Sequence, residues 1–199
     1  MVIGVPKEIK DHEFRVALTP NGVKELCGRG YRVCVQKSAG VGSGFADQAY
    51  SEAGGVILST AEEVFGEAEL IVKVKEPQPE EWELIRKNHV LFTYLHLAAS
   101  KPLTENLLKS GCTAIAYETT EDAKGHFPLL RPMSEIAGRM SVQIGAHFLE
   151  KLQGGSGTLL GGVPGGAPIC TDIRPAISLI GRGGRKECRN STGNSRSTA

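Results

Sequence analysis

Short apolar runs alternate with amphipathic stretches along most of the chain, and Gly, Pro or a capping residue separates them. Runs rich in β-branched residues predict strands, and the stretches between them predict helices. The predicted strands cover residues 1–5, 31–36, 56–58, 70–74, 89–93 and 113–116. The first predicted helix begins at Pro20, with Thr19 as its N-cap. Further helices are predicted over residues 47–53, 60–65 and 102–109, and Thr60 and Glu63 have the spacing of a capping box. This alternation is typical of an α/β fold with a parallel sheet.

A longer helix is predicted from Ser134 to Leu152, because Ile136, Met140 and Phe148 belong to an apolar series with a spacing of four and no proline interrupts it. Ser134 has the side chain of an N-cap residue. The apolar face of this helix is long enough to pack on a sheet or on a partner subunit.

The composition changes after this helix. Residues 154–168 contain seven Gly and two Pro, which predicts a loop between domains. Residues 169–199 are basic and poor in apolar side chains, which predicts a mostly disordered tail. Within the tail, ISLIGRGGRK only imitates a dinucleotide-binding loop, since Lys186 stands where the third glycine belongs. We therefore expect a folded domain over residues 1–153, a Gly-rich loop and a tail.

Length and charge narrow the functional classes. The 199 residues, 40% of them hydrophobic, suit one domain with an appendage, and a net charge of +1 argues against nucleic acid as a partner. No run approaches the roughly 18 apolar residues of a membrane span, and the first residues do not resemble a leader, so we expect a cytoplasmic protein. The five cysteines form no C-x-x-C pair and are expected to be free thiols.

A cation follows the first predicted strand. In a parallel sheet, ligand sites lie beyond the carboxyl ends of the strands, so polar residues placed there can converge. Arg15 stands in EFRVALTP after this strand, and its guanidinium suits a two-bond grip on a substrate carboxylate. The alternative is an ordinary salt bridge to Glu13 or Glu8.

Two lysines end another predicted strand, in VKVKEP. Lys73 and Lys75 share a strand face by two-residue alternation, and Lys75 lies nearer the end of the strand. A lysine held there can polarise a carbonyl oxygen or anchor a carboxylate. A solvated lysine on an edge strand is the alternative.

His96, in FTYLHLAA after the strand 89–93, is the best candidate for a general acid and base, because imidazole titrates near neutral pH. No His or Cys has the spacing of metal ligands, and no metal site is expected. Ser134, at the start of the long helix, could contact a phosphate or the polar end of a cofactor. A plain cap, with Met133 filling the core, is the alternative.

Several of these segments together resemble the N-terminal half of the alanine dehydrogenase/transhydrogenase family. The motifs agree in order and spacing over roughly residues 1–167, and they are GVPKEIK, EFRVALTP, VKVKEP, FTYLHLAA, RPMSEIAGRMSVQ and LLGGVPG. The resemblance implies two α/β domains, one for substrate and one of Rossmann type for NAD. It also implies reversible oxidative deamination of L-alanine to pyruvate and ammonium, and a homo-oligomer, commonly a hexamer.

Roles for single residues come from the same resemblance. It implies that Arg15 and Lys75 hold the substrate carboxylate and carbonyl, and that His96 donates and accepts protons. It places Tyr94 and Met133 in the pocket wall. It also places Ser134 against the cofactor.

The resemblance is lost after about Pro168, where family members continue into the NAD-binding Rossmann domain. We interpret residues 169–199 as a frameshifted or mis-joined reading of the gene, and we expect the NAD-binding domain to be missing from this chain. Weak or no dehydrogenase activity is then predicted for the chain alone. Two other interpretations are a domain like that of a transhydrogenase α subunit, and a non-catalytic module for pyruvate binding or assembly.

Overall fold

The computed structural model describes residues 1–160. The chain divides after Arg131 into two units, and each is described by itself. The predicted tail of residues 169–199, the glycine-rich imitation of a nucleotide loop within it, and the later part of the loop 154–168 lie outside the described residues.

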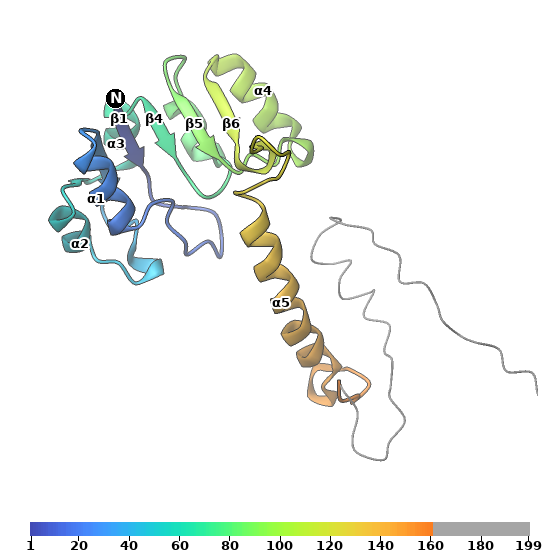
Figure 1. The fold of residues 1–199 in the computed structure, drawn as a ribbon. Coiled ribbons are helices and arrows are strands. Elements are labelled where there is room, and N and C mark those ends of the chain that lie inside the picture. The colour runs from blue at the N-terminus through green and yellow to red at the C-terminus, as the bar shows by residue number, and fades with distance from the viewer. Residues whose placement is uncertain (161–199) are drawn as a thin grey trace, which may run out of the picture. The chain divides into compact units, whose positions relative to one another are not determined.

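The first unit is built on a six-stranded parallel sheet (Figure 1). Its spatial order is β3-β2-β1-β4-β5-β6. The strands are β1 Val2–Val5, β2 Arg32–Gln36, β3 Val56–Leu58, β4 Leu70–Val72, β5 Val90–Thr93 and β6 Thr113–Ala116. Because every recorded strand pair is parallel, all six carboxyl ends lie along one edge. The α/β class and parallel sheet expected from the sequence are confirmed.

Helices cover both faces of this sheet. They are α1 Pro20–Gly28, α2 Asp47–Glu52, α3 Ala61–Glu67 and α4 Lys101–Ser110, with 3-10 turns η1 Val41–Ser43, η2 Pro79–Leu84, η3 Leu97–Ala99 and η4 Tyr117–Thr119. Ile3 and Val5 of β1 belong to the core that includes side chains of α1 and α2. Gly4 points to the other face, where an added Cβ would lie 2.7 Å from the Cβ of Ala68. The absence of a side chain at Gly4 therefore lets α3 pack closely on β1.

Local capping explains where these helices begin. The Thr19 hydroxyl accepts from the backbone N–H of Gly22, and Pro20 is the first residue of α1. Thr60 and Glu63 form the predicted capping box at α3, with the Glu63 N–H donating to the Thr60 hydroxyl at 3.3 Å.

The second unit contains the long helix α5, Arg131–Leu149, and the turn η5, Lys151–Gln153. The helix begins three residues before Ser134, so the predicted N-cap role of Ser134 is wrong. The physical reason for the earlier start is Pro132. Backbone N–H groups in the first turn of a helix have no acceptor within the helix, so a proline, which lacks the N–H, is tolerated there. The helix also ends earlier than the predicted Leu152, and Gly154 follows the η5 turn with a φ of 79°.

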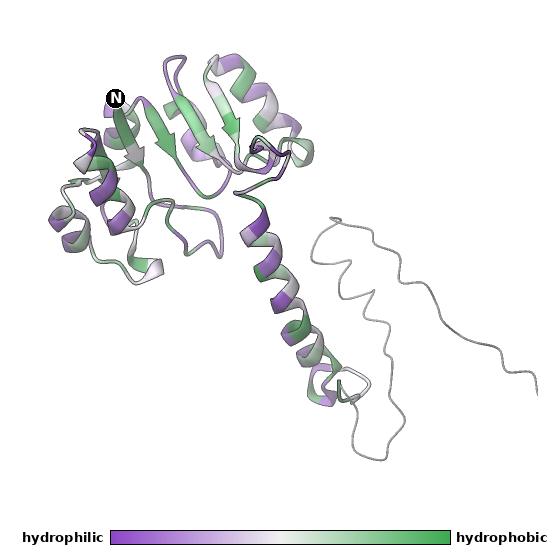
Figure 2. Cartoon of the chain, viewed as in Figure 1, coloured by the Kyte–Doolittle hydropathy of each residue, from purple (hydrophilic) through white to green (hydrophobic). Residues whose placement is uncertain are grey.

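Most apolar side chains of α5 are exposed, and Figure 2 shows apolar and polar residues interleaved along this helix. Ile136 and Met140 are each 50% exposed and Phe148 is 60% exposed, while Gly145 is the buried residue of the helix. No helix within residues 1–160 is long and apolar enough to cross a membrane.

Candidate active site

The strand order places the candidate residues at one point of the sheet. After β1 the chain builds β2 and β3 on one side, and it then returns to place β4 on the other side of β1. Such a reversal leaves a crevice outside the carboxyl ends of the two central strands. Arg15 follows β1, Lys75 follows β4, and Tyr94 and His96 follow β5. The fold therefore brings these four residues to neighbouring strand ends.

Arg15 is held by Glu13. Its Nε donates to Oε1 of Glu13 at 2.7 Å, and its Nη2 donates to Oε2 at 2.5 Å. The Glu13 side chain is 6% exposed, whereas 45% of the Arg15 side chain remains accessible. Burial raises the pKa of Glu13, but the hydrogen bonds from Arg15 outweigh it, and the pKa is lowered. The salt bridge allowed by the sequence is thus present, and it orients a guanidinium that still reaches solvent.

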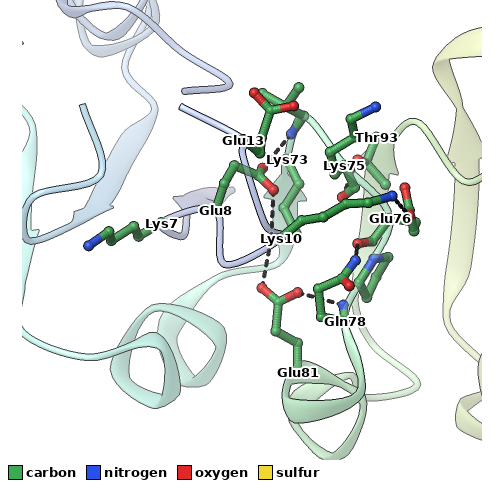
Figure 3. Close-up of polar contacts among 12 residues, drawn as sticks. Lys7, Glu8, Lys10, Glu13, Lys73, Lys75, Glu76, Gln78, Glu81 and Thr93 are labelled. Atoms are coloured by element: carbon green, nitrogen blue, oxygen red, sulfur yellow. Dashed lines mark hydrogen bonds and ion pairs between the residues drawn. The ribbon is translucent and has the colours of Figure 1, made fainter. Parts of the chain in front are cut away.

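Lys73 lies in a different environment from its neighbour Lys75. The Lys73 side chain is fully buried, and its Nζ lies 2.7 Å from Oε1 of Glu81 and 3.4 Å from Oε2 of Glu8 (Figure 3). Glu8 also accepts from the backbone N–H of Val74 at 2.6 Å. Burial raises the pKa of Glu8, although Lys73 opposes this shift. The three side chains form a buried ionic cluster under the site.

Lys75 is half-buried at the end of the same segment. Its carbonyl accepts from the Thr93 hydroxyl at 2.9 Å, which ties its backbone to β5. Figure 3 shows the Lys75 side chain extending away from the Lys73 cluster, and its charge helps to lower the pKa of Glu13. Since β4 lies between β1 and β5, the alternative of an edge-strand lysine is wrong. Lys75 is a cation close to the Arg15–Glu13 pair.

Aromatic rings line the next part of the site. The Tyr94 ring stacks on the imidazole of His96, with centroids 5.8 Å apart and an interplanar angle of 12°. Its hydroxyl donates to the carbonyl of Leu129 at 2.8 Å, and Tyr117 packs edge-on against it at 5.1 Å. Burial raises the pKa of Tyr94, while Arg15 opposes the shift. The Tyr94 phenol is therefore neutral, and its ring lies against an exposed His96.

Glu76 adds a carboxylate near His96. Burial raises its pKa, but the ion pair with Lys10 and a hydrogen bond from its own backbone N–H outweigh burial, and the pKa is lowered; the His96 imidazole acts in the same direction. Its Oε2 atom is buried and has no hydrogen-bond partner among the described residues.

Several of these groups were not among the predicted site residues. Glu81 binds Lys73 from the turn η2, and Glu118 accepts from the backbone N–H groups of Leu95 and His96, so neither glutamate lies on a strand or directly at a strand end where alternation could reveal it. A local signal existed for Glu81, because Gln78 and Glu81 form a capping box at η2.

Met133 and Ser134 lie in the first turns of α5, in the second unit. Their places in the pocket wall and against the cofactor stay predictions. No group of His, Cys, Asp and Glu in residues 1–160 could hold a metal ion.

The β1–α1 connection does not fit a dinucleotide. A dinucleotide site of this topology has a short Gly-x-Gly-x-x-Gly turn after the first strand, whose backbone approaches the pyrophosphate. Here Gly4 is followed by VPKEIK, and the connection runs over residues 6–19 before α1. Instead, the segments that follow β1 and β4 carry the cations Arg15 and Lys75, and such side chains suit a carboxylate ligand.

Comparison with known proteins identifies the family. A family profile described as "Alanine dehydrogenase/PNT, N-terminal domain" matches residues 4–137. The chain belongs to this family. It is 56% identical to the alanine dehydrogenase of Mycolicibacterium smegmatis over 84% of this chain and 45% of that protein. It is 54% identical to the alanine dehydrogenase of Bacillus subtilis over 92% of this chain and 46% of that protein.

Two solved structures have a similar fold. An L-alanine dehydrogenase superposes with a TM-score of 0.78 at 51% identity, covering 90% of this chain and 52% of that one. A transhydrogenase from Sinorhizobium meliloti gives a TM-score of 0.58 at 28% identity, covering 62% of this chain and 35% of that one.

The chain thus spans about half the length of the curated relatives it matches. The alignment with the B. subtilis protein covers 183 residues and leaves no more than 16 of the 199 outside it. Similarity to that relative therefore continues into residues 169–199, and the expectation that the resemblance is lost after about Pro168 is wrong.

Proposed function

We propose that this chain forms the substrate-binding part of an NAD-dependent alanine dehydrogenase, which interconverts L-alanine with pyruvate and ammonium. The observation that carries the proposal is the convergence of Arg15, Lys75 and His96 at neighbouring strand ends around the β1–β4 reversal. High identity to proteins named alanine dehydrogenase supports this reaction over that of the more distant transhydrogenase. The substrate domain would cover residues 1–153, with 154–168 leading to a further domain.

Each group of the site suits one part of a 2-oxo acid. The Arg15 guanidinium, oriented by Glu13, binds the carboxylate, and the Lys75 ammonium polarises the oxygen or nitrogen on C2. Polarisation makes C2 more electrophilic, so water or ammonia can add there. Tyr94 supplies the wall beside the small side chain.

His96 moves the protons in this scheme. In deamination, an imidazole nitrogen accepts a proton from the water molecule that adds to C2 of the imino acid. The same nitrogen then returns that proton to the amine and accepts the proton of the new C2 hydroxyl, so ammonia leaves as the C2 oxygen becomes a carbonyl. Exposure of His96 allows protons to exchange with solvent.

NAD is the cofactor we propose for the whole protein, and it accepts the hydride when bound. The β1–α1 connection does not fit it, because that connection has no Gly-x-Gly-x-x-Gly turn. Ser134 is the residue of this chain that we propose to face the cofactor. We also propose a cytoplasmic homo-oligomer, a hexamer as in the family, and the exposed Ile136, Met140 and Phe148 support an apolar contact in such an assembly.

Calorimetric titration of the 199-residue chain with pyruvate tests the substrate site. Pyruvate is expected to bind, and propionate, which has the carboxylate but no carbonyl, is expected to bind more weakly. The substitution Lys75→Met should remove this preference, because nothing then polarises the carbonyl. Lys101→Met makes the same change at a lysine whose side chain is 86% exposed, and it should leave the preference intact. Equal binding of pyruvate and propionate by the unsubstituted chain would contradict the proposal.

A further inference from the structure

His96 has an unusual backbone conformation. Its φ is 49° and its ψ is 37°, in the left-handed region that residues with a Cβ seldom adopt. Within residues 1–160 the other non-glycine residues with positive φ are His12 and Ser38. Strained backbone of this kind persists only where surrounding groups enforce it. Groups around His96 must therefore enforce this conformation.

The carboxylate of Glu118 binds the backbone at this point. Its Oε1 accepts from the His96 N–H at 2.7 Å and from the Leu95 N–H at 3.1 Å, and its Oε2 lies 3.2 Å from the Leu95 nitrogen. Hydrogen bonds to an ionised acceptor are stronger than neutral ones. Both N–H groups lie just beyond the end of β5, where the strand ladder no longer supplies an acceptor.

Strand register explains how Glu118 reaches this position. Thr93 of β5 is paired with Ala116 of β6, and the two strands are parallel. The segments that follow these two strands are therefore neighbours. Leu95 and His96 lie in the segment after β5, and Glu118 lies in the turn η4 after β6. Leu95 is 2% exposed and anchored in the core, so the chain is free to change direction only after it.

We propose that Glu118 is a positioning residue that holds His96 in the left-handed conformation and thereby sets the direction of its imidazole. The ring then stacks on Tyr94 at 12° while remaining open to solvent. The effect on catalysis rests on the proposed function of His96, whereas the effect on its backbone does not. Glu118 acts through His96 and has no assigned contact with substrate.

Nuclear magnetic resonance of the isotope-labelled 199-residue chain tests both parts. A positive φ brings the amide and α protons of one residue unusually close, so His96 should show a strong cross-peak between them. In Glu118→Ala this cross-peak should weaken to the level of neighbouring residues, and pyruvate affinity should fall about tenfold. Glu118→Gln keeps a neutral acceptor and should retain most of the cross-peak, while the His96 amide proton moves upfield. Glu121→Ala, an exposed glutamate on the same connection, should change neither signal.

A strong His96 cross-peak in Glu118→Ala would overturn the proposal. If that variant does not fold, Glu118→Gln decides, and an unmoved His96 amide proton would overturn it. Failure of the unsubstituted chain to bind pyruvate would refute the proposed function, while the cross-peak would still decide whether Glu118 positions the His96 backbone.

Discussion

The substitution Lys73→Met would remove the ammonium group that lies between the buried carboxylates of Glu8 and Glu81. The Lys73 side chain is 0% exposed, and each glutamate side chain is 3% exposed. Methionine has nearly the same length and shape, so the change removes a charge and little packing. The two carboxylates would then be buried without the cation that lies between them.

Removal of one partner from a buried ion pair costs about 3–5 kcal/mol of unfolding free energy, because the remaining charge has neither water nor a partner. The distances of 2.7 Å and 3.4 Å from Lys73 place both carboxylates within direct ionic contact. The expected loss is therefore a large part of the roughly 5–15 kcal/mol that stabilises a typical domain. The second change in Lys73→Met/Glu81→Gln should recover part of it, since the amide oxygen can still accept from Gln78.

The pH dependence of this loss has a definite sign. Burial already raises the pKa of Glu8 above the ordinary value of 4.5, and Lys73 opposes the shift, so the variant should raise it further. A raised pKa means that the folded state binds the proton more tightly than the unfolded state, and stability falls as pH rises through that pKa. The difference between Lys73→Met and the unsubstituted chain should therefore shrink as pH falls from 7 toward 4.5.

Urea unfolding followed by tryptophan fluorescence measures this loss, because Trp82 is the single tryptophan and lies next to Glu81 in η2. Lys101→Met is the control, since Lys101 pairs with Glu105 on the surface and should cost no more than about 0.5 kcal/mol. A loss below about 1 kcal/mol for Lys73→Met at neutral pH would refute the assignment of a buried charge cluster.

Three further changes test other parts of the account. Arg15→Lys should weaken pyruvate binding about tenfold by calorimetry, because an ammonium cannot make the two parallel bonds of a guanidinium; unchanged affinity would exclude Arg15 as the carboxylate ligand. Thr60→Ala should lower the urea unfolding free energy by about 0.5–2 kcal/mol through loss of the α3 cap, and Thr60→Ser should restore it. Gly4→Ala should lower it by about 1–3 kcal/mol because of the 2.7 Å approach to Ala68, and an unchanged midpoint would show that α3 does not pack this closely.

Local patterns were sufficient for much of the fold. The strands 56–58 and 113–116 have the predicted bounds, and the Thr60 capping box is present, because apolar alternation and capping act over a few residues. The start of α5 was wrong for an equally local reason. A serine before an apolar series has the pattern of an N-cap. Pro132 is also compatible with the first turn of a helix, and α5 begins at Arg131, before Ser134.

The sequence predicted site residues only where they follow the carboxyl end of a predicted strand, because ligand sites of parallel sheets lie there. That rule drew attention to Arg15, Lys75 and His96, each of which follows a different strand. It favoured Lys75 as the lysine nearer the strand end, but it could not predict the burial of Lys73, which depends on Glu8, a residue remote in sequence. The roles of Met133 and Ser134 stay predictions.

The most direct test of the substrate site is a pyruvate titration of the nitrogen-labelled chain, with every backbone amide observed. We predict that the shifts concentrate at Arg15, Lys75, Tyr94 and His96, around the carboxyl ends of β1, β4 and β5, and leave Lys101 unmoved. Saturating pyruvate that moves none of these four amides, or that moves only amides far from these strand ends, would contradict the assignment of this crevice as the substrate site.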